Sequence, residues 1–138
     1  MNKRVCRGKA VTNAFFTYGL IAIGGAIGAC LRFALNEWTL HLFGRAFPFG
    51  TLLVNILGSF VIGLLYGLLI TEQIAPNPWR IFIGIGVLGA FTTFSTFSMD
   101  TVLLLQQGDW LKAIANVVLN LVLCLTLAWL GLKLGSMK

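Results

Sequence analysis

The sequence contains very little charge. Only 10% of its 138 residues are charged, whereas 58% are apolar, and the mean hydropathy is +0.91. A soluble domain requires a far more polar surface, so an ordinary soluble protein is excluded. A chain of this length holds a handful of membrane-spanning helices and no sizeable soluble domain. We therefore expect an all-α integral membrane protein.

Residues that bind metals or perform catalysis are also scarce. The single histidine, His41, has no histidine or cysteine partner at a metal-ligand spacing, and the three cysteines lack such a spacing among themselves. Cys30 and Cys124 lie in apolar runs, where cysteine usually acts as a small hydrophobic residue, so we expect no disulfide framework. The sequence contains no nucleotide-binding or catalytic motif and indicates no enzyme.

Four apolar segments have the length of a membrane-spanning helix. About 20 residues, at 1.5 Å per residue, cross a hydrocarbon core of about 30 Å. The segments are Phe15–Leu35, Thr51–Ile70, Ile81–Leu105 and Ala113–Leu132. We predict one spanning helix in each. A basic tail over residues 1–14 precedes a four-helix transmembrane domain over residues 15–138.

The tail bears on how the chain is oriented in the membrane. With the tail, Lys and Arg number seven on one side and three on the other, which favours cytoplasmic termini. Without it the count is three on each side, and a core without bias can insert either way, as an antiparallel homodimer from one gene requires. Both orientations stay open at this point. The four tail charges are too scattered to indicate a nucleic-acid partner.

Small residues recur at a spacing of four in the first two segments. Gly24 with Gly28, and Ser59 with Gly63, form such pairs. A small residue at each fourth position lets two helix backbones approach closely. We expect tight helix packing at these positions.

Hydroxyl groups are concentrated in the third segment. Five Ser and Thr residues lie between Gly89 and Asp100. Because glycine and β-branched threonine weaken a helix, we predict that this helix is broken near the bilayer midplane, around Thr92 and Thr93. Four helices are too few to bury the freed backbone groups, so we expect a dimer in which two breaks meet. Carbonyl groups that face one another there suit a hard cation such as Na⁺.

The embedded polar groups favour an anion as the transported ligand. Neutral hydrogen-bond donors predominate, and Asp100 is the only carboxylate inside an apolar segment. Phe94 and Phe97 share one helical face, and the positive edges of their rings can help to solvate a small anion, although such a pair is also common in ordinary packing. Asn55 is either an interhelical hydrogen-bonding residue or a donor to the anion. Arg32 either reaches the membrane interface or attracts anions to a pore mouth.

Three motifs resemble the Fluc/CrcB family of fluoride channels. The first combines Gly25 and Gly28 with Arg32 and Phe33, the second runs from Gly50 to Gly63, and the third, the most specific, runs from Gly89 to Ser98. The resemblance extends from about residue 15 to the end of the chain. It implies an antiparallel, dual-topology homodimer with two fluoride pores and a central structural Na⁺.

The resemblance also assigns individual residues. It implies that the backbone carbonyls of Gly89 and Thr92 hold the Na⁺, and that Arg32 is the vestibule arginine. The fluoride pathway then consists of Phe94, Phe97, Asn55, Ser95, Thr96, Asn120 and Arg32. Cys124 departs from the family by standing where serine is frequent, and a thiol is a weaker donor.

The resulting functional hypothesis is passive export of cytoplasmic fluoride by a multi-pass protein of a bacterial inner or plasma membrane. Its partners are the fluoride ion, the lipid bilayer and a second, antiparallel copy of the chain. The alternatives are a small multidrug-type proton-coupled transporter, which requires an embedded carboxylate, and a structural subunit that transports nothing. A heteromer with an oppositely oriented partner chain also stays open.

Overall fold

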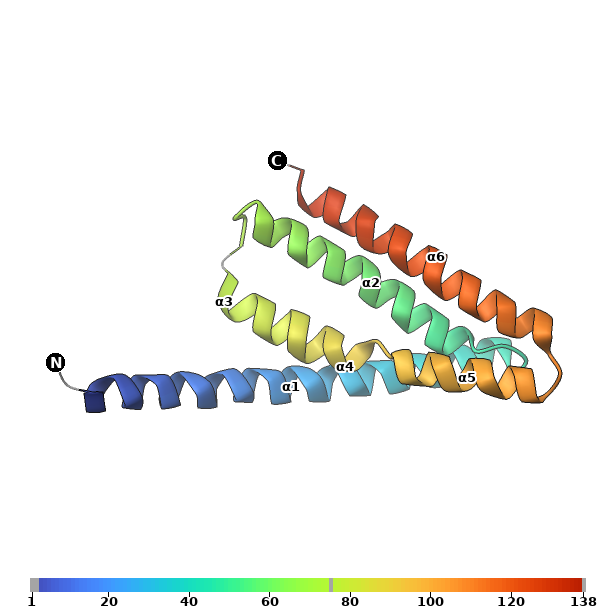
Figure 1. The fold of residues 1–138 in the computed structure, drawn as a ribbon, viewed down its shortest axis with the longest axis horizontal. Coiled ribbons are helices and arrows are strands. Elements are labelled where there is room, and N and C mark those ends of the chain that lie inside the picture. Colours follow the sequence, from blue (N-terminus) through green and yellow to red (C-terminus); the bar gives the residue numbers. More distant parts are fainter. Residues whose placement is uncertain (1–2, 75, 138) are drawn as a thin grey trace.

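The computed structural model describes residues 3–74 and 76–137, and every regular element in these ranges is helical (Figure 1). The elements are α1 (Lys3–Phe43), α2 (Phe49–Ile70), α3 (Pro76–Trp79), the π-helical segment η1 (Arg80–Leu88), α4 (Gly89–Phe91), α5 (Phe94–Gln106) and α6 (Trp110–Gly135).

Four segments of the described chain are long and apolar enough to cross a membrane. They are Ala14–Phe43, Phe49–Ile70, Arg80–Gln106 and Trp110–Gly135. The prediction of four spanning helices is confirmed. The predicted bounds of the last three helices lie close to the observed ones, because apolar length alone determines them.

The first helix is longer than predicted at both ends. It continues past Leu35 to Phe43, because Thr39 satisfies its hydroxyl inside the helix by donating to the carbonyls of Leu35 (3.0 Å) and Asn36 (2.9 Å). The helix ends where Gly44 takes a left-handed conformation, with φ of +69°. At its other end α1 already begins at Lys3, and this part projects beyond the other helices in Figure 1. The domain boundary after residue 14 stays a prediction.

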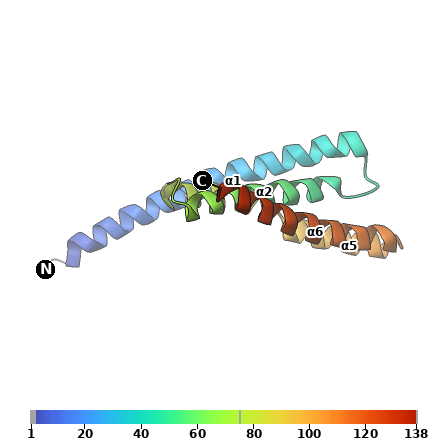
Figure 2. The ribbon, with the colours of Figure 1, turned by 90° about the horizontal axis from the view of Figure 1, so that it is seen from above.

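The helices pack through their small residues. Helix α2 lies between α1 and α6 (Figure 2), and a Cβ atom on Gly63 would overlap the backbone oxygen of Ala128 in α6. Gly131 of α6 meets the backbone of Phe60 in the same way, and Gly28 of α1 meets that of Val87 in η1. Close backbone approach at small residues, as predicted for Gly28 and Gly63, is confirmed.

The third long segment is interrupted in its middle. Helix α4 stops at Phe91, and α5 starts at Phe94. The two residues between them are extended: Thr92 has φ of −79° and ψ of 157°, and Thr93 has φ of −152° and ψ of 114°. The candidate site lies at this interruption.

Candidate functional site

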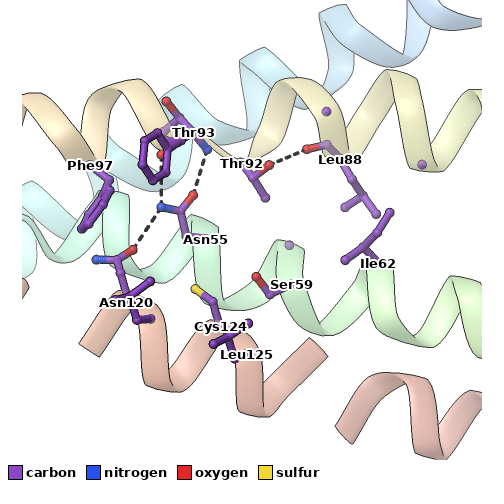
Figure 3. Close-up of a pocket in the computed structure, with 15 residues that line it drawn as sticks. Asn55, Ser59, Ile62, Leu88, Thr92, Thr93, Phe97, Asn120, Cys124 and Leu125 are labelled. Carbon is purple, nitrogen blue, oxygen red and sulfur yellow. Dashed lines mark hydrogen bonds between the residues drawn. The ribbon is translucent and has the colours of Figure 1, made fainter. Parts of the chain in front are cut away.

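A cavity of about 470 Å³ lies between α2, α6 and the interrupted segment (Figure 3). We call it the break cavity. Several of the predicted site residues line it: Asn55, Gly89, Thr92, Phe94, Phe97 and Asn120. Ser59 and Cys124 also line it, as do apolar side chains such as Ile62 and Leu125. Residues that are far apart in sequence therefore meet around one space.

Asn55 holds the interruption in place. Its Oδ1 accepts a hydrogen bond from the backbone N–H of Thr93 (2.8 Å), and its Nδ2 donates to the carbonyl of the same residue (3.1 Å). This reciprocal pair copies the bonding between two β-strands and satisfies the extended backbone of Thr93. The remaining Nδ2 hydrogen points to Asn120 Oδ1, at 3.1 Å, as Figure 3 shows.

The interruption removes the helical donors of the two carbonyls that the family resemblance assigns to Na⁺. In a continuous α-helix, the carbonyls of Gly89 and Thr92 would accept from the N–H groups of Thr93 and Thr96, four residues later. Here the Thr93 N–H donates to Asn55, and the Thr96 N–H donates to the Thr93 hydroxyl at 3.2 Å. The N–H groups that would ordinarily donate to these two carbonyls therefore donate to side-chain oxygens instead.

The Phe94 and Phe97 rings lie side by side at the start of α5. Their centroids are 5.4 Å apart and their planes are tilted by 54°. Phe97 is buried, with 9% of its surface exposed, whereas Phe94 is 76% exposed. Phe97 is therefore packed within the chain, whereas most of the Phe94 side chain is uncovered.

A hydroxyl cluster caps α5. The Thr93 hydroxyl lies 3.2 Å from that of Ser95 and 3.0 Å from that of Thr96. Ser95 is exposed, and Thr96 lines a second cavity of about 350 Å³ rather than the break cavity. Thr96 therefore lines a different cavity from Asn55 and Phe97.

Two further observations concern residues outside the break cavity. Arg32 lies half-buried on α1 and lines neither of these two cavities of the described chain. In the second cavity, Thr51 donates to Asp100 Oδ2 at 2.7 Å, which ties α2 to α5. The sequence analysis did not single out Thr51, although it stands four residues before Asn55 and so shares a helix face with it.

Comparison with known proteins identifies the family. The family model described as CrcB-like protein, Camphor Resistance (CrcB), matches residues 19–132. The chain belongs to the CrcB family. The match includes every predicted site residue, so the family resemblance inferred from the three motifs is confirmed.

Curated members of the CrcB family resemble the chain over most of its length. A protein of Pseudoalteromonas translucida is 59% identical over 119 residues, which cover 86% of this chain and 99% of the relative. Proteins of Vibrio parahaemolyticus and Vibrio cholerae are 55% and 54% identical, over 87% and 86% of this chain and 94% of each relative. All three are named fluoride-specific ion channel FluC. Together with the four apolar helices, these relatives identify a multi-pass bacterial membrane protein.

Proposed function

We propose that this chain forms a fluoride channel, through which cytoplasmic fluoride leaves a bacterial cell passively. The observation that carries the proposal is the lining of the break cavity. Neutral donors and a phenylalanine pair border this cavity, and its described lining includes no carboxylate. Such a lining suits a small anion that must shed its water. The names of the CrcB relatives support the same function. The chain is a channel protein and not an enzyme.

In this proposal, fluoride passes along the ring edges of Phe94 and Phe97, which carry partial positive charge. Neutral donors replace part of its hydration shell along the way; these are Asn55, Asn120, Ser95 and Thr96. Arg32 raises the local anion concentration at the pore mouth. Because the structure gives both Nδ2 hydrogens of Asn55 to protein oxygens, fluoride must displace one of those oxygens to reach this donor.

The proposed assembly is a dimer of two oppositely oriented copies, with the interruption near the bilayer midplane. The interruption supports it, because the Gly89 carbonyl has lost its helical donor and Gly89 is exposed on the break cavity. Freed backbone groups are not stable against lipid and need protein or water beside them. A second copy supplies that cover and brings a second break to the same place.

The same assembly suits a structural Na⁺. The carbonyls of Gly89 and Thr92, which have lost their helical donors, are hard oxygen ligands of the kind that such cations prefer. Two copies would present four of them. In the described chain no group of three His, Cys, Asp or Glu side chains could hold a metal, so backbone oxygens are the ligands of this proposal. When bound, Na⁺ would neutralise the carbonyl dipoles that face one another.

Fluoride efflux from liposomes that contain only this protein tests the proposal. Vesicles loaded with potassium fluoride should release fluoride once valinomycin balances the charge, and vesicles loaded with chloride should release little. Absence of fluoride release from the folded protein alone contradicts a homomeric channel. Release that appears only after an oppositely oriented family member is added indicates a heteromer.

The same vesicles separate a channel from a proton-coupled transporter of the small multidrug type. Such a transporter needs a carboxylate that exchanges protons with a cationic substrate. Asp100 is a carboxylate in the third segment, and it accepts a hydrogen bond from Thr51. We expect the Asp100→Asn variant still to release fluoride, and we expect that release to remain independent of a pH gradient. Accumulation of an organic cation driven by a pH gradient, lost in Asp100→Asn, would favour the transporter.

A further inference from the structure

Four side chains form a continuous chain of hydrogen bonds that leads away from the break cavity. Asn55 Nδ2 donates to Asn120 Oδ1 (3.1 Å), and Asn120 Nδ2 donates to Asn116 Oδ1 (3.0 Å) and to the Asn116 backbone carbonyl (3.0 Å). Asn116 Nδ2 donates to Thr101 Oγ1 (2.9 Å), which donates to the carbonyl of Phe97 (2.8 Å). We call Asn55, Asn120, Asn116 and Thr101 the amide relay. It crosses from α2 to α6 and on to α5.

Both ends of the amide relay specify its direction. At one end the backbone N–H of Thr93 can only donate, so Asn55 must turn its Oδ1 to it and its NH₂ toward Asn120. At the other end Thr101 has given its single hydrogen to the Phe97 carbonyl, so it offers only lone pairs to Asn116. Reversing one amide alone would set two oxygens or two NH₂ groups against each other.

Burial makes such a mismatch costly. Asn116 is 0% exposed, so water cannot replace a lost partner at its side chain, and Asn120, at 5% exposed, meets water only at the break cavity. A buried polar group without a partner is much more costly than an ordinary hydrogen bond is favourable. The two internal amides must therefore keep a common direction.

This direction is the wrong one for an anion beside Asn55. Asn120 turns its oxygen, an acceptor, toward Asn55 and its NH₂ away. An anion that accepts the Asn55 hydrogen must take the place of Asn120 Oδ1. The nearby Oδ1 then repels the anion until the Asn120 amide reverses. Reversal then requires Asn116 to reverse as well, and Thr101 to turn its hydroxyl from the Phe97 carbonyl to Asn116 Oδ1. It also breaks the bond from Asn120 to the Asn116 backbone carbonyl, a cost that the new bond from the Asn120 amide to the anion must offset.

We propose that the part of the amide relay beyond Asn55, namely the Asn120 and Asn116 amides and the Thr101 hydroxyl, reverses as a unit when an anion occupies the break cavity beside Asn55. Asn116 and Thr101 are positioning residues for this step. A hydroxyl can both donate and accept, so Thr101 can end the relay in either direction. The inference rests on the proposed fluoride conduction. It adds a coupling between the cavity and a pair of residues outside it, because neither Asn116 nor Thr101 lines the cavity.

Substitution of Thr101 tests the proposal by flux. Thr101→Val keeps the shape but can neither donate nor accept, so fluoride efflux should fall about tenfold or more, whereas Thr101→Ser should stay within about threefold of wild type. Thr126→Val is the matched control, since Thr126 is exposed on α6, and its efflux should be unchanged. Wild-type efflux in a folded Thr101→Val protein, or equal losses in the Val and Ser variants, would overturn the proposal.

Solid-state NMR of the ¹⁵N-labelled wild-type protein in lipid tests it without any change at Thr101. The side-chain amide signal of Asn116, identified by its absence from Asn116→Asp, should shift when fluoride replaces gluconate, while that of exposed Gln73 should not. A static relay predicts no shift at Asn116. If wild type conducts fluoride and the Asn116 signal does not move, the relay proposal fails alone; if wild type does not conduct, the proposed function fails with it.

Discussion

Replacing Asn55 by aspartate removes both of its donors and keeps its shape. The new carboxylate can still accept from the Thr93 N–H, but it places an oxygen 3.1 Å from the Thr93 carbonyl and 3.1 Å from Asn120 Oδ1. Two hydrogen bonds become two contacts between acceptors. At about 1.5 kcal/mol each, their loss should destabilise the folded protein by about 3 kcal/mol.

The effect of Asn55→Asp on conduction comes from charge. A carboxylate about 4 Å from an anion, at an effective dielectric constant of about 20, raises the energy of that anion by about 4 kcal/mol. Each 1.4 kcal/mol corresponds to about a factor of ten, so fluoride efflux should fall by about a thousandfold. Efflux is measured with a fluoride electrode on liposomes at equal protein density.

The control for this variant is Gln73→Glu, which makes the same change from amide to acid at an exposed position outside the candidate spans. It should conduct like wild type. If Asn55→Asp also conducts like wild type, Asn55 is not on the fluoride path, and its role is limited to holding the interruption. Size-exclusion chromatography in detergent verifies that the variant folds before the flux is compared.

Three further predictions follow from the structure. Phe94→Ile and Phe97→Ile should each lower fluoride efflux more than about tenfold while the protein stays folded, because the ring edge is lost and most apolar volume is kept; unchanged efflux in both variants would reduce the pair to packing. Gly131→Ala should lower the unfolding midpoint, because the new Cβ would overlap the Phe60 backbone at a cost of about 1–3 kcal/mol. The control Gly25→Ala places its Cβ in open space and should leave the midpoint unchanged, so equal midpoints for the two variants would contradict the packing. Deleting residues 1–13 should shift the chain toward mixed orientation, read from a C-terminal cysteine with an impermeant thiol reagent, and an unchanged orientation would show that the tail does not set topology.

Much of the fold follows from apolar length and small-residue spacing. These two signals are local, so they predict the four helices and the close approach at Gly28 and Gly63. The end of α1 was predicted too early, because the apolar segment ends at Leu35, whereas the side-chain bonds of Thr39 keep the helix continuous to Phe43. A polar residue that is satisfied within its own helix does not end it.

The candidate site was predictable in composition but not in its pairings. The concentration of donors and the phenylalanine pair are visible in sequence, and Asn55, Phe97 and Asn120 do meet at one cavity. The bonds from Thr51 to Asp100 and from Asn116 to Thr101 depend on how each helix is rotated against its neighbour. No local pattern sets that rotation, so these partners became apparent only in three dimensions.

Recording currents from this protein alone in a planar bilayer tests the central claim most directly. Under a fluoride gradient, with equal chloride and equal pH on both sides, the reversal potential should move by about 59 mV for each tenfold change in the fluoride ratio. It should stay fixed when a chloride gradient or a pH gradient is imposed instead. A reversal potential that follows the chloride or the proton gradient would contradict a fluoride-selective, passive pore.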